Sequence, residues 1–154
     1  MSMYNVNAGV PKTLVKTIIS WILKQTDFQH LNSVLNNILN TPISPELLPP
    51  DHNNINQKTE ERIGPYELHD FFLFHFIRFG ASFEKIKHIA YLAFKHKYSL
   101  EEIDKWLKIF FKRFFTQQFK RNCTPDGPKI GLVSLSPRGD WKMPSDADYE
   151  QWIK

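Results

Sequence analysis

The sequence contains little of what a secreted or membrane-spanning protein usually needs. One cysteine in 154 residues excludes an intrachain disulfide bond and favours a reducing compartment. No apolar run approaches the roughly 18 residues that a membrane-spanning helix requires. The first twelve residues lack the basic and apolar segments of a signal peptide. We therefore expect a cytoplasmic protein without a membrane partner.

Glycine is also scarce, the six histidines are scattered, and the spacing of both residue types excludes two kinds of site. No G-x-G-x-x-G occurs, and the segment "GPKIG" at 127–131 is not a Walker loop because no Lys-Ser or Lys-Thr follows it. Neighbouring histidines lie six or more residues apart, so none has the i, i+4 spacing of helical metal ligands. We predict no metal site in this chain and no tightly bound cofactor.

What the chain does contain is apolar surface and an uneven charge. Hydrophobic residues make up 42% and include thirteen Phe, so the composition is that of one globular domain. The formal net charge is +4. Residues 1–64 carry five basic and five acidic residues, whereas residues 105–142 carry nine basic residues against two acidic ones. The second region therefore favours an anionic neighbour, such as phosphate, nucleic acid or an acidic protein.

Helical spacing of apolar residues predicts about five helices and a mainly α fold. They begin after Pro11, near Phe28, at Pro65, after Ser82 and after Ser99. Ser82 is predicted as an N-cap, Ser99 and Glu102 as a capping box, and Gly80 as the end of the third helix. The last helix is expected to reach about Phe119.

Two long segments break the helical pattern. The segment at about 41–63 carries four prolines in "NTPISPELLPP", and a loop of this length is usually a lid, a binding loop or a linker. The tail at about 122–154 is expected to be irregular, with one short strand in "KIGLVSL" and a helical turn near its end. It also contains Arg-Gly-Asp in "SLSPRGDWKMPSD", but an adhesion signal requires secretion, for which the sequence offers no route.

Five segments resemble a known enzyme family in order and spacing. They are "YNVNAGVPKTL", "SPELLPP", "TEERIGPYELHDFFLFHFIRFG", "QQFKRNCTPDGPK" and "SLSPRGDWKMPSD". Together they make essentially the whole chain similar to the carboxy-terminal part of glutamine-dependent NAD⁺ synthetases. The resemblance implies the C-terminal portion of a parallel α/β domain of the PP-loop type, also called adenine nucleotide alpha-hydrolase-like.

The resemblance also implies a reaction and its partners. Members of the family use ATP and Mg²⁺ to adenylate deamido-NAD⁺, and ammonia from a glutaminase domain then displaces AMP to give NAD⁺. They assemble as homo-oligomers. Under this interpretation the substrates are nucleotides, and nucleic acid is the less favoured partner.

Site residues carry over by position from the resemblance. Lys12 matches a lysine that contacts phosphate at the reaction centre, and Ser44 matches a hydroxyl on the lid. Glu46 and Glu60 match acidic positions on the lid, and Lys120 and Arg121 match a basic pair that faces the nucleotide phosphates in the family. The tail segment matches one found in the glutamine-dependent form of the enzyme. We expect Arg138, Asp140 and Trp141 to belong to a packed irregular tail that is anchored by Trp141 and lies near the contact with the glutaminase domain.

The chain departs from the family by omission. The S-G-G-x-D-S loop that grips ATP pyrophosphate does not occur in these 154 residues, and neither does the glutaminase with its catalytic cysteine. We therefore expect residues 1–154 to be a fragment of the synthetase domain that is inactive alone. The alternative is a standalone basic helical module that binds nucleic acid or an acidic protein partner.

Overall fold

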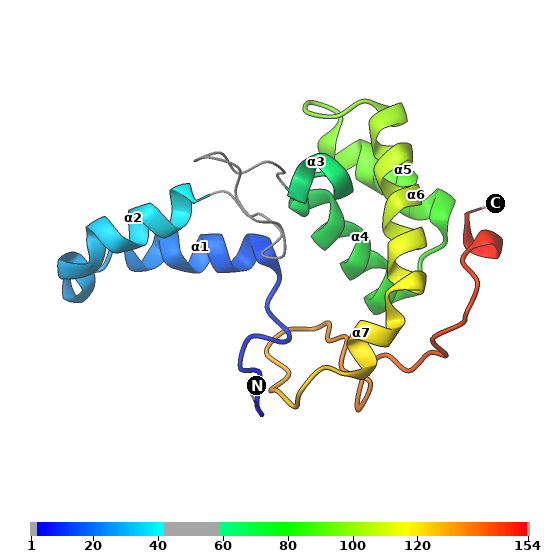
Figure 1. Cartoon of the computed structure of the whole chain (residues 1–154). Helices are drawn as coiled ribbons and strands as arrows, with labels where there is room; N and C mark the ends of the chain where they lie inside the picture. The colour runs from blue at the N-terminus through cyan, green and yellow to red at the C-terminus, as the bar shows by residue number, and fades with distance from the viewer. Residues whose placement is uncertain (1–2, 42–58, 154) are drawn as a thin grey trace, which may run out of the picture. The chain divides into compact units, whose positions relative to one another are not determined.

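All of the regular secondary structure among the described residues is helical. The structure is a computed structural model and describes residues 3–41 and 59–153 (Figure 1). Within these ranges there are seven α-helices, two 3₁₀ helices and no strand. They are α1 Lys12–Ile22, η1 Thr26–Leu31, α2 Asn32–Asn40, α3 Thr59–Ile63, α4 Tyr66–Phe79, α5 Phe83–Phe94, α6 Leu100–Thr116, α7 Gln118–Asn122 and η2 Glu150–Trp152. The prediction of a mainly α chain is confirmed.

The chain divides into two compact units. Unit 1 comprises Met1–Val10 and Glu67–Lys154, and unit 2 comprises Pro11–Tyr66. The division runs close to the start of α4, so the predicted first two helices fall in unit 2 and the other three in unit 1. Each unit is described below by itself.

Unit 1 is built around α4, α5 and α6. On α4 the side chains of Leu68, Phe72 and Phe76 are buried, at one-turn spacing along one face. The ring of Phe76 meets that of Phe111 on α6 edge-on, with centroids 5.1 Å apart. Aromatic pairs prefer such edge-to-face packing, which adds to the gain from burying their area. The core of unit 1 is therefore a cluster of phenylalanines, in agreement with the apolar stripes read from the sequence.

Local sequence signals set the ends of the unit 1 helices. Ser99 accepts a hydrogen bond from the backbone N–H of Glu102 at 3.2 Å, and Glu102 accepts one from Ser99 N–H at 2.9 Å. This is the predicted capping box. Ser82 caps α5 by accepting from Lys85 N–H at 3.4 Å. Gly80 ends α4 with a φ of 59°, a left-handed conformation that favours glycine. All three predictions are confirmed.

Other helix boundaries differ from the prediction. The fifth helix was expected to run to about Phe119, but α6 ends at Thr116 and α7 begins at Gln118. The second helix is split into η1 and α2. The segment 59–63, expected as the end of a loop, forms α3. Residues 42–58, which make up most of the expected lid, lie outside the described part of the chain.

The tail of unit 1 is irregular, as predicted, but contains no strand. The expected strand over "KIGLVSL" is wrong: residues 129–135 form only bends and irregular backbone. An isolated parallel bridge joins Tyr4 to Asp126 instead, and Asn5 N–H donates to the Asp126 carbonyl at 2.7 Å. A Cβ at Gly127 would collide with the Asn5 carbonyl oxygen, so glycine permits this close approach. The expected helical turn near the end is confirmed as η2.

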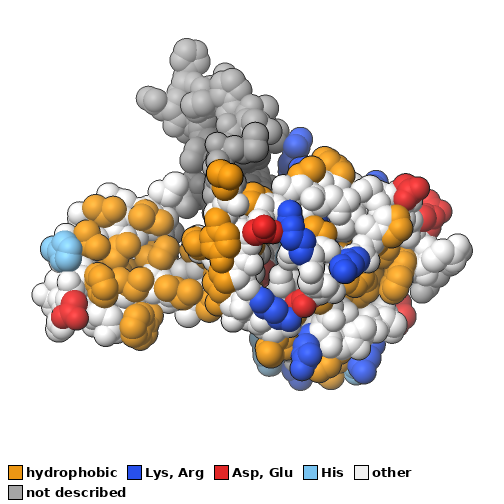
Figure 2. Space-filling model, turned by 90° about the horizontal axis from the view of Figure 1, so that it is seen from below, with side chains coloured by type: hydrophobic (Ala, Val, Ile, Leu, Met, Phe, Trp, Pro, Cys, Tyr) orange, Lys and Arg blue, Asp and Glu red, His pale blue; other side chains and the backbone are white. Residues whose placement is uncertain are grey.

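Unit 2 contains a pair of helices with little burial. No side chain of α1, η1 or α2 is buried, although α1 contacts α2 and α2 contacts η1. Figure 2 shows hydrophobic side chains gathered over this pair. The apolar faces predicted from the sequence exist, but most of each face is exposed to solvent. Among the described helices, none is long and apolar enough to cross a membrane.

Candidate functional site

Lys12 is the first residue of α1 and projects from the start of unit 2. Its side chain is exposed. The helix is preceded by Pro11, which makes no side-chain cap, and its first turn contains no acidic residue. The N–H groups at a helix start carry partial positive charge and suit anions. Lys12 and the uncapped helix start together make this end of α1 electropositive.

Glu60 lies on α3, also in unit 2, and stabilises the start of α4. Its Oε1 accepts a hydrogen bond from the backbone N–H of Tyr66 at 3.1 Å. Tyr66 is the first residue of α4 and follows Pro65. The carboxylate therefore satisfies one of the N–H groups that a helix start leaves unpaired. The other two expected lid residues, Ser44 and Glu46, lie outside the described residues.

The basic pair on α7 divides into one engaged and one exposed side chain. Arg121 Nε donates to Gln118 Oε1 at 2.9 Å, and its Nη2 donates to the same oxygen at 2.6 Å and to the Phe114 carbonyl. The guanidinium lies 4.2 Å from the centroid of the Phe114 ring. Burial lowers the pKa of Arg121 to about 10, so it remains a cation at neutral pH. Arg121 is thus largely committed to contacts within unit 1.

Lys120, by contrast, projects from α7 into solvent. Its side chain is exposed, and its Nζ lies 5.9 Å from the ring of Phe119, which is itself 52% exposed. A lysine amine in this setting keeps donors available for an anion. Of the two basic residues, Lys120 is the one whose charge is freely accessible.

Gln118 organises this corner of unit 1, although it is not among the site residues predicted from the sequence. The side chain is fully buried, and besides accepting from Arg121 it donates through Nε2 to Asn122 Oδ1 at 2.9 Å. Asn122 Nδ2 in turn donates to Ser145 Oγ in the tail at 2.8 Å. Gln118 continues the apolar stripe of Phe111 and Phe114 at helical spacing. A polar residue at a core position was the signal, because buried polar groups are hydrogen-bonded.

The tail residues singled out from the sequence are held by contacts within unit 1. Arg138 pairs with Asp126 at 2.7 Å and donates through Nη1 to the Thr124 carbonyl at 2.8 Å. Asp140 pairs with Lys129 at 2.6 Å and accepts from Ser134 N–H at 3.0 Å. Both charged groups of the Arg-Gly-Asp sequence therefore have internal partners, which disfavours a free recognition loop.

Trp141 anchors the tail to the phenylalanine core. Its ring centroid lies 5.1 Å from that of Phe114 and 5.4 Å from that of Phe76. Its Nε1 is shielded from solvent and makes no hydrogen bond within the described part of the chain. The expectation that the tail packs through this tryptophan is confirmed.

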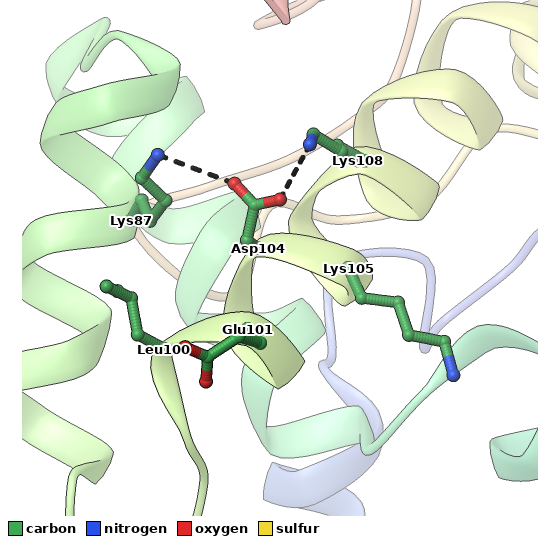
Figure 3. Close-up of a pocket in the computed structure, with 6 residues that line it drawn as sticks. All are labelled: Lys87, Leu100, Glu101, Asp104, Lys105 and Lys108. Carbon is green, nitrogen blue, oxygen red and sulfur yellow. Dashed lines mark ion pairs between the residues drawn. The ribbon is translucent and has the colours of Figure 1, made fainter.

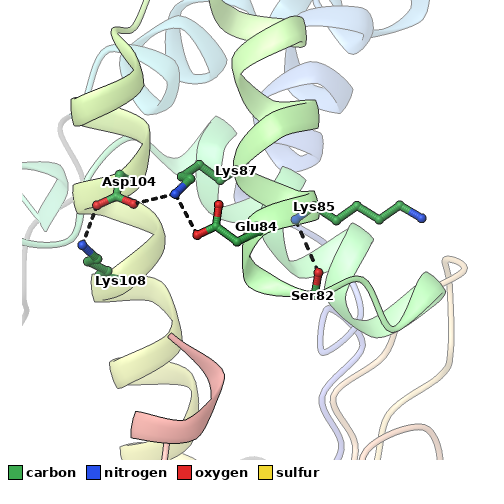
Figure 4. Close-up of polar contacts among 6 residues, drawn as sticks. All are labelled: Ser82, Glu84, Lys85, Lys87, Asp104 and Lys108. Carbon is green, nitrogen blue, oxygen red and sulfur yellow. Dashed lines mark hydrogen bonds and ion pairs between the residues drawn. The ribbon is translucent and has the colours of Figure 1, made fainter. Parts of the chain in front are cut away.

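An open surface pocket of about 600 Å³ lies on α5 and α6, and none of the residues that line it is a predicted site residue (Figure 3). Its lining includes Lys87, Asp104 and Lys108. Asp104 pairs with Lys108 at 2.7 Å and with Lys87 at 3.4 Å, and Lys87 also pairs with Glu84 at 2.8 Å (Figure 4). These charges neutralise one another and connect α5 to α6. We therefore interpret the charged lining as an ion-pair network that stabilises the two helices, and not as a binding site.

Acidic and histidine side chains do not gather into a metal site in the described ranges. No group of three or more His, Cys, Asp or Glu residues there could hold a metal ion. The predicted site residues fall into both units: Lys12 and Glu60 in unit 2, and the basic pair and the tail residues in unit 1.

Comparison with known proteins confirms the resemblance found in the five segments. The chain is 41% identical over 172 aligned residues to the protein named glutamine-dependent NAD(+) synthetase of Mycobacterium leprae. It is equally similar to the proteins of that name from Mycobacterium bovis and Mycobacterium tuberculosis. The alignments cover 99% of the chain but 25% of each relative, so the chain spans about a quarter of their length. No protein-family model matches the chain.

Proposed function

We propose that the chain is part of a glutamine-dependent NAD⁺ synthetase. In that enzyme it would serve the ATP-dependent amidation of deamido-NAD⁺ to NAD⁺ through an acyl-adenylate, with ammonia derived from glutamine. The observation that carries this proposal is the 41% identity, which extends over 99% of the chain. An isolated basic module would have no reason to match an enzyme along its whole length. The helices would then belong to the C-terminal portion of a PP-loop domain.

The exposed cations support roles in phosphate contact. Lys12 lies at the uncapped start of α1, and Lys120 has no competing ion pair among the described residues. Positive charge at these positions would offset the charge that develops when pyrophosphate leaves or AMP is displaced. Arg121 would contribute its charge while its contacts with Gln118 hold α7 in place. Ser44, Glu46 and Glu60 remain proposed members of the substrate lid.

Magnesium enters this reaction with ATP, as a substrate complex. The described residues hold no acidic cluster that fits the ion, so we derive no step through it. The rest of the synthetase would supply the phosphate-gripping loop and the glutaminase domain that this sequence lacks. We propose a cytoplasmic homo-oligomer for the assembled enzyme.

The alternative, a standalone module that binds nucleic acid or an acidic protein, is not favoured. Lys87 on α5 and Lys108 on α6 both pair with Asp104. In the tail, Lys129 pairs with Asp140 and Arg138 pairs with Asp126. Pairing of this kind reduces the free positive charge on which binding to nucleic acid depends.

A two-part assay tests the proposal. The isolated chain, given ATP, Mg²⁺, deamido-NAD⁺ and ammonia, should form no NAD⁺. A chimera in which this chain replaces the matched quarter of the Mycobacterium leprae relative should form NAD⁺, and Lys120→Ala in that chimera should reduce the rate at least tenfold. An inactive but folded chimera, beside an active relative, would contradict the proposed function. NAD⁺ formation by the isolated chain would contradict the expected inactivity.

A further inference from the structure

Of the nineteen large hydrophobic side chains that are exposed in the described chain, eight lie on α1, η1 and α2. Leu14, Ile18 and Trp21 recur at helical spacing along α1 and are 40%, 43% and 60% exposed. Val34 and Ile38 recur at the same spacing on α2 and are 54% and 51% exposed. We call these five side chains the α1–α2 face. Hydrophobic side chains gather visibly over these helices in Figure 2.

This pair of helices has no core of its own. None of the side chains of α1, η1 or α2 is buried, and the two α-helices have only 11 and 9 residues. Helices this short are marginal in water unless an amphipathic face packs against something. A large contiguous apolar surface on a folded chain usually marks a contact with another protein surface.

The chemistry of the face fits an apolar, uncharged partner. The sequence of α2, "NSVLNNILN", contains no charged residue, and Lys12 and Lys16 lie on the other side of α1 by helical spacing. The five side chains of the face are exposed by 40 to 60% and offer on the order of 500 Å², more than half of the roughly 800 Å² per partner of a standard interface. Nucleic acid would not be held by a surface without charge.

We propose that the α1–α2 face docks on the synthetase polypeptide that lies outside the matched quarter of the relatives. This inference rests on the proposed function. The relatives are about four times as long as the matched segment, so most of their polypeptide is available to cover the face. A covalently linked partner acts at an effective concentration in the millimolar range, whereas a second copy acts only at its own concentration. The linked polypeptide is therefore the favoured occupant.

Thiol labelling tests the proposal in the full chain and in the chimera described above. Cys123, which is exposed, is first replaced by serine. Ile18→Cys and Val34→Cys then place one probe on each helix of the face, and Leu92→Cys, at a position on α5 that is 54% exposed, is the matched control. Labelling at each site is followed by peptide mass spectrometry, and circular dichroism checks that the helices persist.

The expected result is a labelling rate at both face positions at least tenfold lower in the chimera than in the isolated chain, with Leu92→Cys protected much less. Equal rates in a folded chimera would overturn the proposal. Protection in the isolated chain that increases with its concentration would also overturn it, in favour of a second copy. NAD⁺ formation by the chimera is measured separately. If the chimera forms NAD⁺ but the face is not protected, only the docking proposal is contradicted. If the face is protected but no NAD⁺ forms, only the proposed reaction is contradicted.

Discussion

Units 1 and 2 use the same sequence pattern with opposite outcomes. Helix α6 in unit 1 and helix α1 in unit 2 both carry an apolar stripe at helical spacing. On α6 six side chains of that stripe are buried, whereas α1 has none buried. All the buried hydrophobic side chains among the described residues lie between Leu68 and Phe115, in unit 1. An amphipathic pattern therefore predicts which face of a helix packs, but not whether this chain supplies the surface that covers it.

The largest effect expected from this contrast is on the core of unit 1. Phe111→Ala removes a fully buried ring that contacts Phe76 and Phe83. It should lower the free energy of unfolding by about 3–5 kcal/mol, because the burial of the ring is lost and the substitution leaves a new cavity in the core. Trp21→Ala, at a position 60% exposed in unit 2, should change it by less than about 0.5 kcal/mol. Urea titrations followed by circular dichroism measure both; similar losses would show that unit 2 is buried in solution.

A smaller effect is expected at the buried polar corner of α7. Gln118→Ala leaves the guanidinium of Arg121 and the amide of Asn122 without their shared partner. An unsatisfied buried group costs about 1–3 kcal/mol, and the tail contact between Asn122 and Ser145 should loosen with it. Lys120→Ala, on the same short helix but exposed, is the control and should be nearly neutral. If both variants unfold at the same urea concentration, the network does not stabilise unit 1.

The ends of the helices and the corner at α7 show which features could be predicted from the sequence and which could not. The capping box of Ser99 and Glu102, and Gly80 at the end of α4, were predicted correctly because each depends on residues within one turn. The break at Gln117 and the role of Gln118 were missed because they depend on how α7 packs against the core. The strand expected over residues 129–135 failed for a similar reason: its backbone has no neighbouring strand in the described chain to pair with.

The candidate site was predictable only in part. The resemblance singled out Lys120 and Arg121 as a pair, and no local rule separates an exposed lysine from an engaged arginine. Their difference arises from Phe114 and Gln118, whose positions the fold determines. The resemblance gives Glu60 only a place on the lid, whereas its carboxylate accepts a hydrogen bond from Tyr66 N–H, six residues later, just after the proline that precedes α4.

Helix capping provides a third, smaller test of the contrast between the units. Ser99→Ala should lower the free energy of unfolding by about 1 kcal/mol, because the backbone N–H of Glu102 at the start of α6 loses its acceptor. Helix α1 has no side-chain cap to lose, so Pro11→Ser should instead stabilise unit 2 slightly. Amide hydrogen exchange of the first turn of each helix separates the two effects. Unchanged exchange at Glu102 in Ser99→Ala would contradict the capping assignment.

The smallest expected effect is a loss of stability at acid pH, and it should be confined to unit 1. Burial alone raises the pKa of Glu67, but hydrogen bonds from Lys97 and Tyr98 and the charge of Lys97 outweigh burial and leave that pKa below its ordinary value. As the pH falls, the carboxylate of Glu67 is therefore protonated in the unfolded chain before it is protonated in the folded chain. The stabilisation is complete above about pH 4.3, the ordinary value for glutamate, and is lost as the pH falls through the lower folded value. Glu67 is partly exposed, so solvent screening limits the contribution to less than about 1 kcal/mol.

Glu67→Gln removes this contribution and leaves the other titrating groups in place. The difference in unfolding free energy between wild type and Glu67→Gln should be largest near neutral pH and shrink as the pH falls below the ordinary pKa of glutamate, about 4.3. Hydrogen exchange at Leu68 and at Val34 reports on units 1 and 2 in the same samples. The acid-dependent difference should appear at Leu68 and be absent at Val34, since the ion pair of Glu67 with Lys97 lies within unit 1. An equal change at both positions would mean that the two units unfold as one, and the contrast between them would then describe burial but not stability.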